Sequence, residues 1–225
     1  MRRGVAGDER LGSFNAPRTA CTALHELPFI YVRRMARPKD PAKEKALLDA
    51  ALALVLKNGM SGVKMSDLAR EAGVAIGTAY VYFDDKATLL NALYSHVRAR
   101  SVQRYAHLHD PGKPFMDNFK TIWHAYLDQV LEHPQDLVFI EQYHRSPFMD
   151  RRVVGRNDEL LKPIRELIDR GKQEKLVRQL ETEVLIQQLA GALNALAVSH
   201  HAGRFRLKKS TIEAAYRMAW DSVRA

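Results

Sequence analysis

The sequence predicts an all-α protein in which a small N-terminal domain of three helices, with a helix-turn-helix, precedes a larger helical domain. Three observations support this prediction. Apolar residues recur at helical spacing along most of the chain, and no segment of convincing length alternates as a strand would. Proline, glycine and aspartate separate the periodic segments where helices begin and end. The segment 65–83, MSDLAREAGVAIGTAYVYF, has the pattern of two short helices joined by a turn.

The first helix is expected from about Pro41 to Lys57. Asp40 precedes it as the N-cap, Pro41 takes the first helical position, and Gly59 follows its end. An apolar stripe runs along one side through Leu47, Leu48, Ala51, Leu52 and Val55. Because two short helices cannot enclose a core by themselves, this stripe supplies the third wall of the N-terminal domain.

The next two helices form the helix-turn-helix. Four apolar residues of the first of them are spaced i, i+3, i+4 and i+7 and therefore share one face: Met65, Leu68, Ala69 and Ala72. Gly73 follows, and glycine readily adopts the positive φ at which the first helix stops and the chain turns.

The helix after this turn is expected to present small, hydroxyl-bearing and aromatic side chains to solvent. Ala79 and Phe83 face inward with Val74. The side chains at the outer face or its margins are those of Ile76, Thr78, Tyr80 and Tyr82. Such a helix suits the major groove of DNA, which admits one helix and offers hydrogen-bonding edges and thymine methyl groups.

Further helices follow this motif. Asp84 and Asp85 are capping residues before a fourth helix that begins near Lys86, and proline and glycine mark residues 107–114 as a loop. Five more helical segments are expected at 115–132, 134–144, about 150–175, 182–201 and 209–224. The segment 184–198 is apolar around most of its circumference, which indicates that it packs against more than one partner.

These elements divide the chain into three parts: a disordered extension at 1–34, a helix-turn-helix domain at 35–84 and a helical domain at 85–225. One hypothesis is that Met35 is the physiological start. The alternative is a basic arm that reaches phosphates or a minor groove through Arg33, Arg34, Arg37 and Lys39.

Composition narrows the function classes. The chain has 225 residues, of which 46% are hydrophobic, so it is long enough to bury a substantial core. Its net charge of +9 is spread along the chain and does not by itself predict a nucleic-acid partner. A single cysteine, Cys21, excludes an intramolecular disulfide framework, and no apolar run is long enough to span a bilayer. We expect a cytoplasmic protein that has no membrane partner and needs no cofactor.

The segment 71–90, EAGVAIGTAYVYFDDKATLL, resembles the signature of the TetR family of transcriptional regulators. The shared features are an Ala-Gly-Val turn, a Gly-Thr-aliphatic-Tyr recognition helix, a Tyr-Phe pair and a lysine that opens the fourth helix. The resemblance is close over roughly residues 40–94. Beyond them it extends only to length, helical character and two apolar helices at the end. It implies a homodimeric regulator, more often a repressor, that binds a palindromic operator and is released by a small-molecule effector.

The resemblance also implies roles for single residues. Gly77 lets the backbone approach DNA, Thr78 and Tyr80 contact bases or phosphates, and Tyr82 and Lys86 contact phosphates. The full set of expected DNA-binding residues is Lys64, Ser66, Ala75, Ile76, Gly77, Thr78, Tyr80, Val81, Tyr82 and Lys86. Packing of the two tyrosines against neighbouring helices is the alternative.

Two departures from the family pattern concern helix caps. Many relatives have Ser or Thr at the position of Ala75, and a capping hydroxyl often stands at the position of Lys64. No Arg, Asn or Gln lies within 76–82 to read guanine or adenine by paired hydrogen bonds. Specificity is therefore expected from Ile76, Thr78, Val81 and DNA shape.

The effector-binding site and the dimer interface are both expected in the helical domain at 85–225. An apolar cavity with polar anchors is expected from Trp123, His124, Tyr126, Phe139, Gln142 and Tyr143, with Phe148, Met149 and His144 nearby. The last two helices either pack within one subunit or meet their copies as a four-helix interface. The expected interface residues are Leu189, Leu193, Leu196, Ile212, Tyr216 and Ala219.

Three rival readings remain. An enzyme would use His124 or His144 as a general base beside Glu141, but the sequence has no nucleophile or phosphate-loop motif. A metal site would draw on the same residues, or on His107 and His109, without a recognised ligand spacing. A DNA-binding adaptor would meet a protein partner through 184–198 and bind no small ligand.

Overall fold

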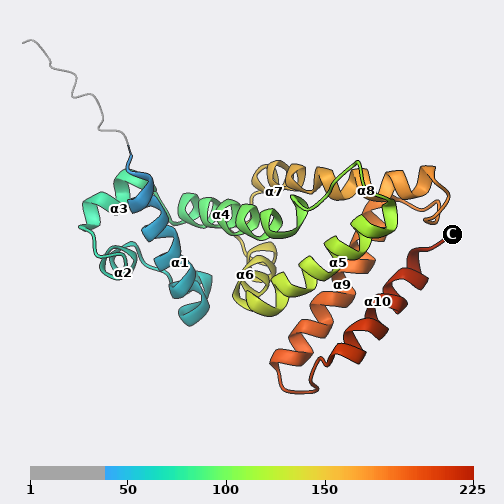
Figure 1. The fold of residues 1–225 in the computed structure, drawn as a ribbon. Helices are drawn as coiled ribbons and strands as arrows, with labels where there is room; N and C mark the ends of the chain where they lie inside the picture. The colour runs from blue at the N-terminus through green and yellow to red at the C-terminus, as the bar shows by residue number, and fades with distance from the viewer. Residues whose placement is uncertain (1–38) are drawn as a thin grey trace, which may run out of the picture. The chain divides into compact units, whose positions relative to one another are not determined.

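The computed structural model describes residues 39–225. The secondary structure of this part consists of helices joined by loops, with one isolated antiparallel bridge between Val177 and Arg224 (Figure 1). The helices are α1 (Pro41–Gly62), α2 (Met65–Glu71), α3 (Ile76–Tyr82), α4 (Lys86–Ala106), α5 (Phe115–Glu132), α6 (Pro134–His144), α7 (Arg151–Asp158), α8 (Lys162–Gln173), α9 (Thr182–His201) and α10 (Lys209–Val223). The expectations for residues 1–34, Met35, Cys21 and the arm up to Arg37 lie outside the described residues. No described helix is both long and apolar enough to cross a membrane.

Local sequence signals set several helix ends as expected. The Asp40 carboxylate accepts a hydrogen bond from the Ala42 N–H at 2.9 Å, and Asp85 accepts one from the Thr88 N–H at 2.7 Å. This bond from Thr88 lowers the pKa of Asp85. Gly73 has a φ of +66° at the turn between α2 and α3. Both expected N-caps and the expected glycine turn are therefore confirmed.

Two helix boundaries differ from the prediction. In α1 the helix assignment continues to Gly62, although Gly59 interrupts it with a φ of +70°. The single helix expected at about 150–175 is divided into α7, a 3₁₀ turn at Glu159–Leu161 and α8. Pro163 has no N–H to donate to the preceding turn, so a continuous α-helix would lose a hydrogen bond and meet the proline ring there.

One apolar core joins the N-terminal helices to α4, α6 and α7. Its fully buried members include Leu47, Leu68 and Ala79 from the first three helices, and it continues into Phe139 and Tyr143 of α6. The Tyr143 hydroxyl donates a hydrogen bond to Asn91 of α4 at 2.6 Å. The core of the helix-turn-helix therefore extends beyond residue 84 and includes part of α6.

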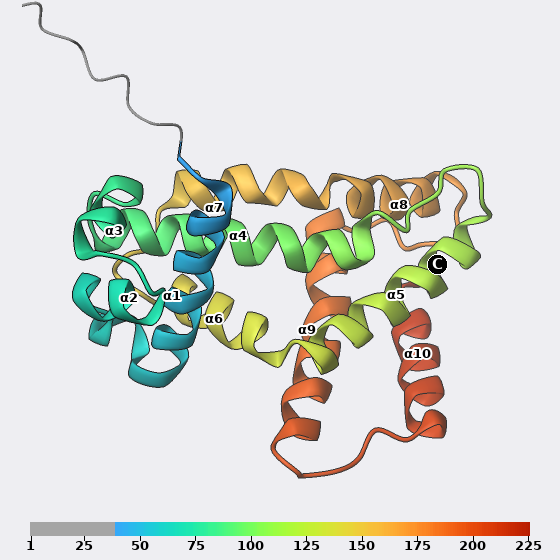
Figure 2. The same cartoon turned by 60° about the vertical axis from the view of Figure 1, so that its left-hand side comes forward.

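A second core fills the space between α4, α5, α8, α9 and α10. Figure 2 shows α9 and α10 joined at one end by residues 202–208. Gly171 of α8 lies so close to Phe115 and Val177 that a Cβ built there would approach their side chains to 2.5 and 2.7 Å. A glycine is therefore required where α8 meets the start of α5.

A buried carboxylate ties α4 to α6. Asp136 is 1% exposed, forms an ion pair with Arg100, and accepts hydrogen bonds from Ser101 at 3.0 Å and Arg104 at 3.2 Å. Burial by itself raises the pKa of Asp136, but the hydrogen bond and positive charge of Arg100 outweigh it, so the pKa is lowered. Asp136 therefore stays ionised and holds the two helices together.

Candidate functional site

The second helix of the helix-turn-helix has an exposed apolar side. Ile76 is 50% exposed, Tyr80 48% and Val81 62%, while Ala79 between them is fully buried. Gly77 is also exposed, and a Cβ added to it would meet no atom within 4 Å. We call Ile76, Gly77, Tyr80 and Val81 the α3 face; Thr78 is half-buried beside it.

The ends of α2 and α3 border this face. Lys64, Ser66 and Ala75 are all exposed. Neither Lys64 at the start of α2 nor Ala75 at the start of α3 accepts a capping hydrogen bond through its side chain. As the sequence predicts, α2 and α3 therefore begin without a hydroxyl side chain to cap their first N–H groups.

Tyr82 does not lie where the sequence predicted. Its side chain is 9% exposed, accepts a hydrogen bond from the Asp40 N–H at 2.8 Å and donates one to the Asp40 carbonyl at 3.1 Å. The Lys39 ammonium lies 5.7 Å from the centre of the Tyr82 ring and donates to the Tyr82 carbonyl at 3.2 Å. The prediction of an outward Tyr82 is wrong, because its hydroxyl is used to hold α3 against the start of α1. A phosphate contact by Tyr82 stays an untested prediction.

Lys86 is half-buried, and its ammonium makes two contacts within the protein. It donates a hydrogen bond to the Ser61 carbonyl at 2.6 Å and lies 5.1 Å from the centre of the Phe148 ring. Phe148 belongs to the segment between α6 and α7. Lys86 therefore links the helix-turn-helix to the helical half.

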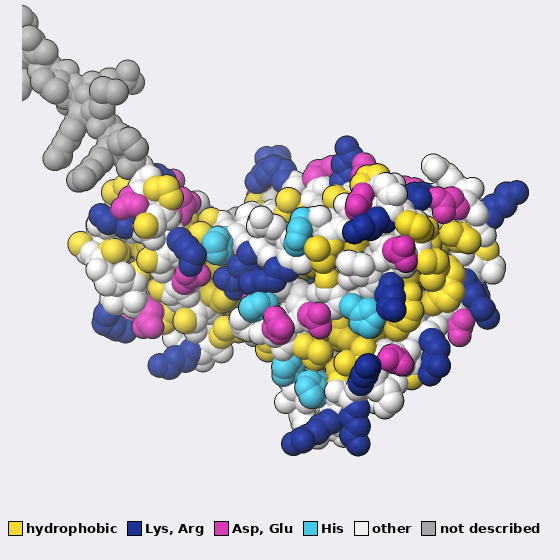
Figure 3. All heavy atoms as spheres, in the orientation of Figure 1, with side chains coloured by type: hydrophobic (Ala, Val, Ile, Leu, Met, Phe, Trp, Pro, Cys, Tyr) yellow, Lys and Arg dark blue, Asp and Glu magenta, His cyan; other side chains and the backbone are white. Residues whose placement is uncertain are grey.

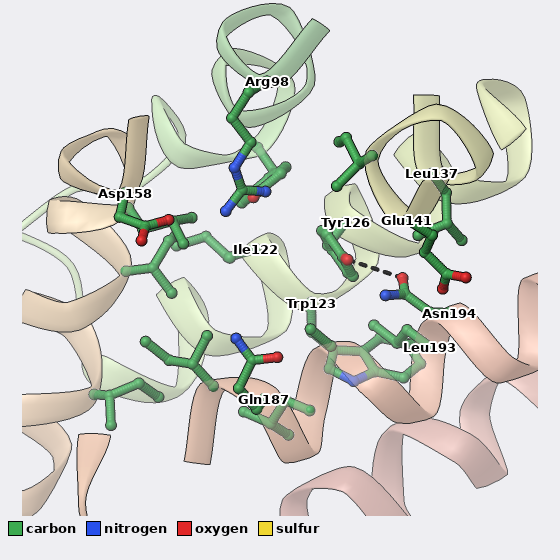
Figure 4. Close-up of a pocket in the computed structure, with 18 of the residues that line it drawn as sticks. Arg98, Ile122, Trp123, Tyr126, Leu137, Glu141, Asp158, Gln187, Leu193 and Asn194 are labelled. Atoms are coloured by element: carbon green, nitrogen blue, oxygen red, sulfur yellow. Dashed lines mark hydrogen bonds between the residues drawn. The ribbon is translucent and has the colours of Figure 1, made fainter. Parts of the chain in front are cut away.

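The helical half contains a cavity of about 560 Å³ between α4, α5, α6, α7, α8 and α9, and exposed residues such as Glu141 and Gln187 form part of its wall (Figure 4). Its walls are largely aliphatic and aromatic, and several polar side chains enter them. The Tyr126 hydroxyl donates to Asn194 at 2.9 Å, which joins α5 to α9 across one side. A cavity of this size and character is typical of a site for a small organic molecule.

Only part of the expected effector set lines this cavity. Trp123 and Tyr126 do, and so does His144. Phe139 and Tyr143 are fully buried on the other side of α6, in the core shared with the helix-turn-helix, and Gln142 is exposed. These side chains sit elsewhere because α6 is covered on two sides, and the sequence pattern did not show which side faces a cavity.

Arg98 was missed by the sequence analysis and lines the cavity from α4. Its position does carry a signal, because it lies four residues after Tyr94 and seven before Tyr105, both of which line the cavity as well. An arginine within an otherwise apolar helical face is the pattern that would have identified it.

His124 lies apart from Glu141 and His144. It stacks against Tyr216 of α10 with ring centres 5.6 Å apart, whereas Glu141 and His144 both line the cavity. Burial, together with the positive charge of Arg98, lowers the pKa of His144 and so favours its neutral form. Within residues 39–225 no three His, Cys, Asp or Glu side chains come close enough to hold a metal ion.

The expected dimer residues point largely into their own subunit. Leu193 is 2% exposed, and both Leu189 and Leu193 line the cavity. Tyr216 packs on Phe119 and Trp123, at ring distances of 6.0 and 5.4 Å. Leu196, Ile212 and Ala219 are half-buried against the same core. Leu193 is therefore not on the surface of the subunit, because this side of α9 is used to close the cavity; the dimer role of the other five residues stays a prediction.

Comparison with known proteins identifies both halves of the chain. The family described as bacterial regulatory proteins, tetR family, matches residues 47–93, and the family described as tetracyclin repressor-like, C-terminal domain, matches residues 114–224. The chain belongs to the TetR family. It is thus a transcription regulator with a DNA-binding helix-turn-helix, and its family is one of regulators and not of enzymes.

Relatives of this TetR-family protein resemble it along most of its length. An uncharacterized HTH-type transcriptional regulator of Haemophilus influenzae is 26% identical over 177 residues, which cover 76% of this chain and 89% of the relative. The crystal structure of a TetR family transcription regulator from Marinobacter aquaeolei is 26% identical, with a TM-score of 0.76 over 82% of this chain and 97% of the other.

A third match concerns the DNA-binding half alone. The regulator BetI of Agrobacterium fabrum is 49% identical over 51 residues, which are 23% of this chain and 25% of the relative. Regulators of the TetR family bind DNA and usually form dimers. The α3 face lies within the matched DNA-binding domain of this family member.

Proposed function

We propose that this TetR-family regulator is a repressor that binds a palindromic operator as a homodimer and leaves it when a small molecule fills the cavity. The observation that carries the DNA-binding part is the α3 face, on which Ile76, Tyr80 and Val81 are each about half exposed or more. Large apolar side chains left exposed on one short helix need a partner surface. A major groove accepts such a helix.

Base reading would come from the α3 face and Thr78. Ile76 and Val81 suit thymine methyl groups, and the Thr78 hydroxyl suits a base edge or a phosphate. Exposed Lys64 and Ser66 at the start of α2 would contact phosphates. Lys86 is also proposed to contact a phosphate. Its ammonium has three N–H donors, and only one of them is used by the Ser61 carbonyl.

Two helices support coupling between the cavity and the α3 face. Leu137 and Ile140 of α6 line the cavity, while Phe139 and Tyr143 of the same helix lie in the core shared with the helix-turn-helix. Tyr94 of α4 lines the cavity and is also a member of that core. A ligand that shifts α4 or α6 would therefore move the recognition helix, and two half-sites fit only one separation of the two helices.

The dimer surface that we propose is the outer side of α9, and it does not include Leu193. An exposed stripe with the spacing of one helical face runs along α9 through Val184, Gln188, Gly191, Ala195 and Val198. Val184 is 53% exposed and Val198 51%. In the view of Figure 3, apolar side chains gather over the region of α5, α9 and α10.

The test begins with selection of genomic fragments that the purified full chain retains. Binding of the recovered duplex, measured by fluorescence anisotropy, is then compared with a scrambled duplex, and the mass of the complex gives the number of subunits. We expect two subunits on one symmetric site. A single subunit that binds the operator, together with a protein partner on α9, would instead support an adaptor.

A further inference from the structure

Two residues of the cavity wall each have a buried hydrogen-bond donor without a partner among the described residues. Arg98 Nε and Trp123 Nε1 are buried, and neither has a hydrogen-bond partner within residues 39–225. Both residues line the cavity, where the Arg98 guanidinium enters from α4 and the Trp123 indole lies across from it on α5 (Figure 4). Buried donors without acceptors are costly, so each of these two groups indicates that an acceptor of a bound molecule belongs in the cavity.

Arg98 also forms no ion pair with another described residue, in contrast to other arginines near it. Arg100 and Arg104 pair with Asp136, and Arg145 lies 3.8 Å from Glu141. Arg98 forms no ion pair with any described carboxylate, although Asp158 lines the same cavity. Its charge nevertheless acts inside the cavity, because it opposes the rise that burial causes in the pKa of Tyr105 and Tyr126.

The remaining polar groups of the cavity restrict the ligand further. Glu141 is paired with Arg145, and the lowered pKa of His144 favours its neutral form, so Arg98 and Asp158 are the remaining charged side chains of the wall. A single negative charge beside Arg98 is then favoured, whereas a second one would approach Asp158. The rest of the wall is apolar and includes Ile122, Leu161, Ile164, Leu167, Ile168 and Ile186.

We infer that the cavity binds an apolar monocarboxylate, with its carboxylate on the Arg98 guanidinium and its apolar body against Trp123 and the aliphatic side chains of α8 and α9. A carboxylate accepts two parallel hydrogen bonds from one guanidinium, which a neutral ester or an amine does not do. The Trp123 indole N–H supplies one further donor. This inference rests on the proposed function, in which the cavity holds the effector, and it names the effector's chemistry.

The test uses the full chain with Trp220→Phe, which leaves Trp123 as its only tryptophan and therefore as a fluorescent reporter inside the cavity. Dodecanoate and 2-naphthoate represent a chain and a ring with the same charged group. Methyl dodecanoate and dodecylamine represent the same chain without the anion. We expect at least one carboxylate to bind, with the ester at least about tenfold weaker, as for the loss of a charged hydrogen bond, and the amine weaker still.

A matched pair of variants locates the anion. Arg98→Met is expected to remove the preference for carboxylate over ester, and Arg98→Lys to retain part of it because the charge remains without the planar fork. Arg156→Met is the control, since Arg156 is an exposed arginine of α7 that does not belong to the cavity wall. Thermal unfolding of each variant shows that it is folded.

Three results would overturn the inference: equal binding of acid and ester, tightest binding of the amine, or an unchanged preference in folded Arg98→Met or Arg98→Lys. Operator binding without any ligand is measured on the same samples. If the operator binds and no carboxylate does, the inference fails and the proposed DNA-binding function stands. If no duplex is preferred, the proposed function fails whatever the carboxylates do.

Discussion

The Tyr82 hydroxyl holds both backbone groups of Asp40, since it accepts from the N–H at 2.8 Å and donates to the carbonyl at 3.1 Å. Asp40 is the N-cap of α1, and Tyr82 is the last residue of α3. Tyr82 stands where the family pattern implies a DNA contact, but in the structure its hydroxyl fixes α3 to the start of α1.

Tyr82→Phe therefore tests a structural role against a direct DNA contact. Loss of both hydrogen bonds is expected to lower the free energy of unfolding by about 1–2 kcal/mol, because the Asp40 N–H and carbonyl lose their partner. The slope of log affinity against log salt should not change. Tyr80→Phe, at an exposed site, is the control for stability. If Tyr82→Phe reduced the slope by about one unit, this result would support a direct contact between Tyr82 and a phosphate.

Lys86→Ala is expected to weaken binding to all duplexes and to reduce the salt slope by about one unit, because one phosphate contact is lost. Thr78→Ala is expected to change base preference instead. Lys120→Ala removes an exposed cation from α5 and serves as the control for net charge. Titrations of cognate and random duplexes at several salt concentrations separate these effects, and equal losses on both duplexes from all three variants would contradict the assignment.

Asp136→Asn is expected to destabilise the protein by about 3 kcal/mol at pH 7, as when one partner of a buried ion pair is removed. The pKa of Asp136 is lowered in the folded state, so its contribution is complete above the pKa of an unfolded aspartate and disappears as the pH falls through the folded value. The difference between wild type and variant should therefore shrink below about pH 4.

The control for this variant is Asp49→Asn. Asp49 also lies near Arg100, at 3.7 Å, but its side chain is 44% exposed. An exposed pair contributes at most about 1 kcal/mol, so urea unfolding of Asp49→Asn should differ little from that of the wild type. Equal losses in the two variants would mean that burial of Asp136 is not what makes its ion pair important.

Gly171→Ala tests the packing of α8 on α5. The added methyl group would overlap the side chains of Phe115 and Val177, and such overpacking costs about 1–3 kcal/mol. Gly155→Ala on α7 is the matched control, because a Cβ there meets nothing within 4 Å and alanine is the better helix former. A stabilised Gly171→Ala protein in thermal unfolding would show that α8 and α5 are not this close.

Local chemistry accounts for the parts of the fold that could be predicted. The bounds of α5, α6 and α9 agree with the expected segments because proline, loop residues and apolar periodicity act over one or two turns. The same holds for the caps at Asp40 and Asp85. The break before Pro163 was missed because the apolar pattern continues through it, although the proline itself was a signal.

The orientation of side chains depended on contacts distant in sequence. Tyr82 is turned inward by Asp40, which lies 42 residues earlier, and no periodicity reports such a contact. Likewise, α6 and α9 are apolar on more than one side, so their sequences could not show that Leu137 and Leu193 face the cavity while Phe139 and Val198 do not. The outward positions of Ile76 and Tyr80 followed from the short helix alone.

Val81→Glu gives the most direct test of the claim that the α3 face docks into DNA. Val81 is 62% exposed, so the thermal unfolding temperature should stay within about a degree of the wild-type value, as for a surface substitution. Anisotropy at low ionic strength should show that the wild type prefers its recovered duplex over a scrambled one, and that the variant loses this preference because a carboxylate faces the phosphates. Unchanged binding by Val81→Glu, or a wild type with no preference for any duplex, would contradict the account.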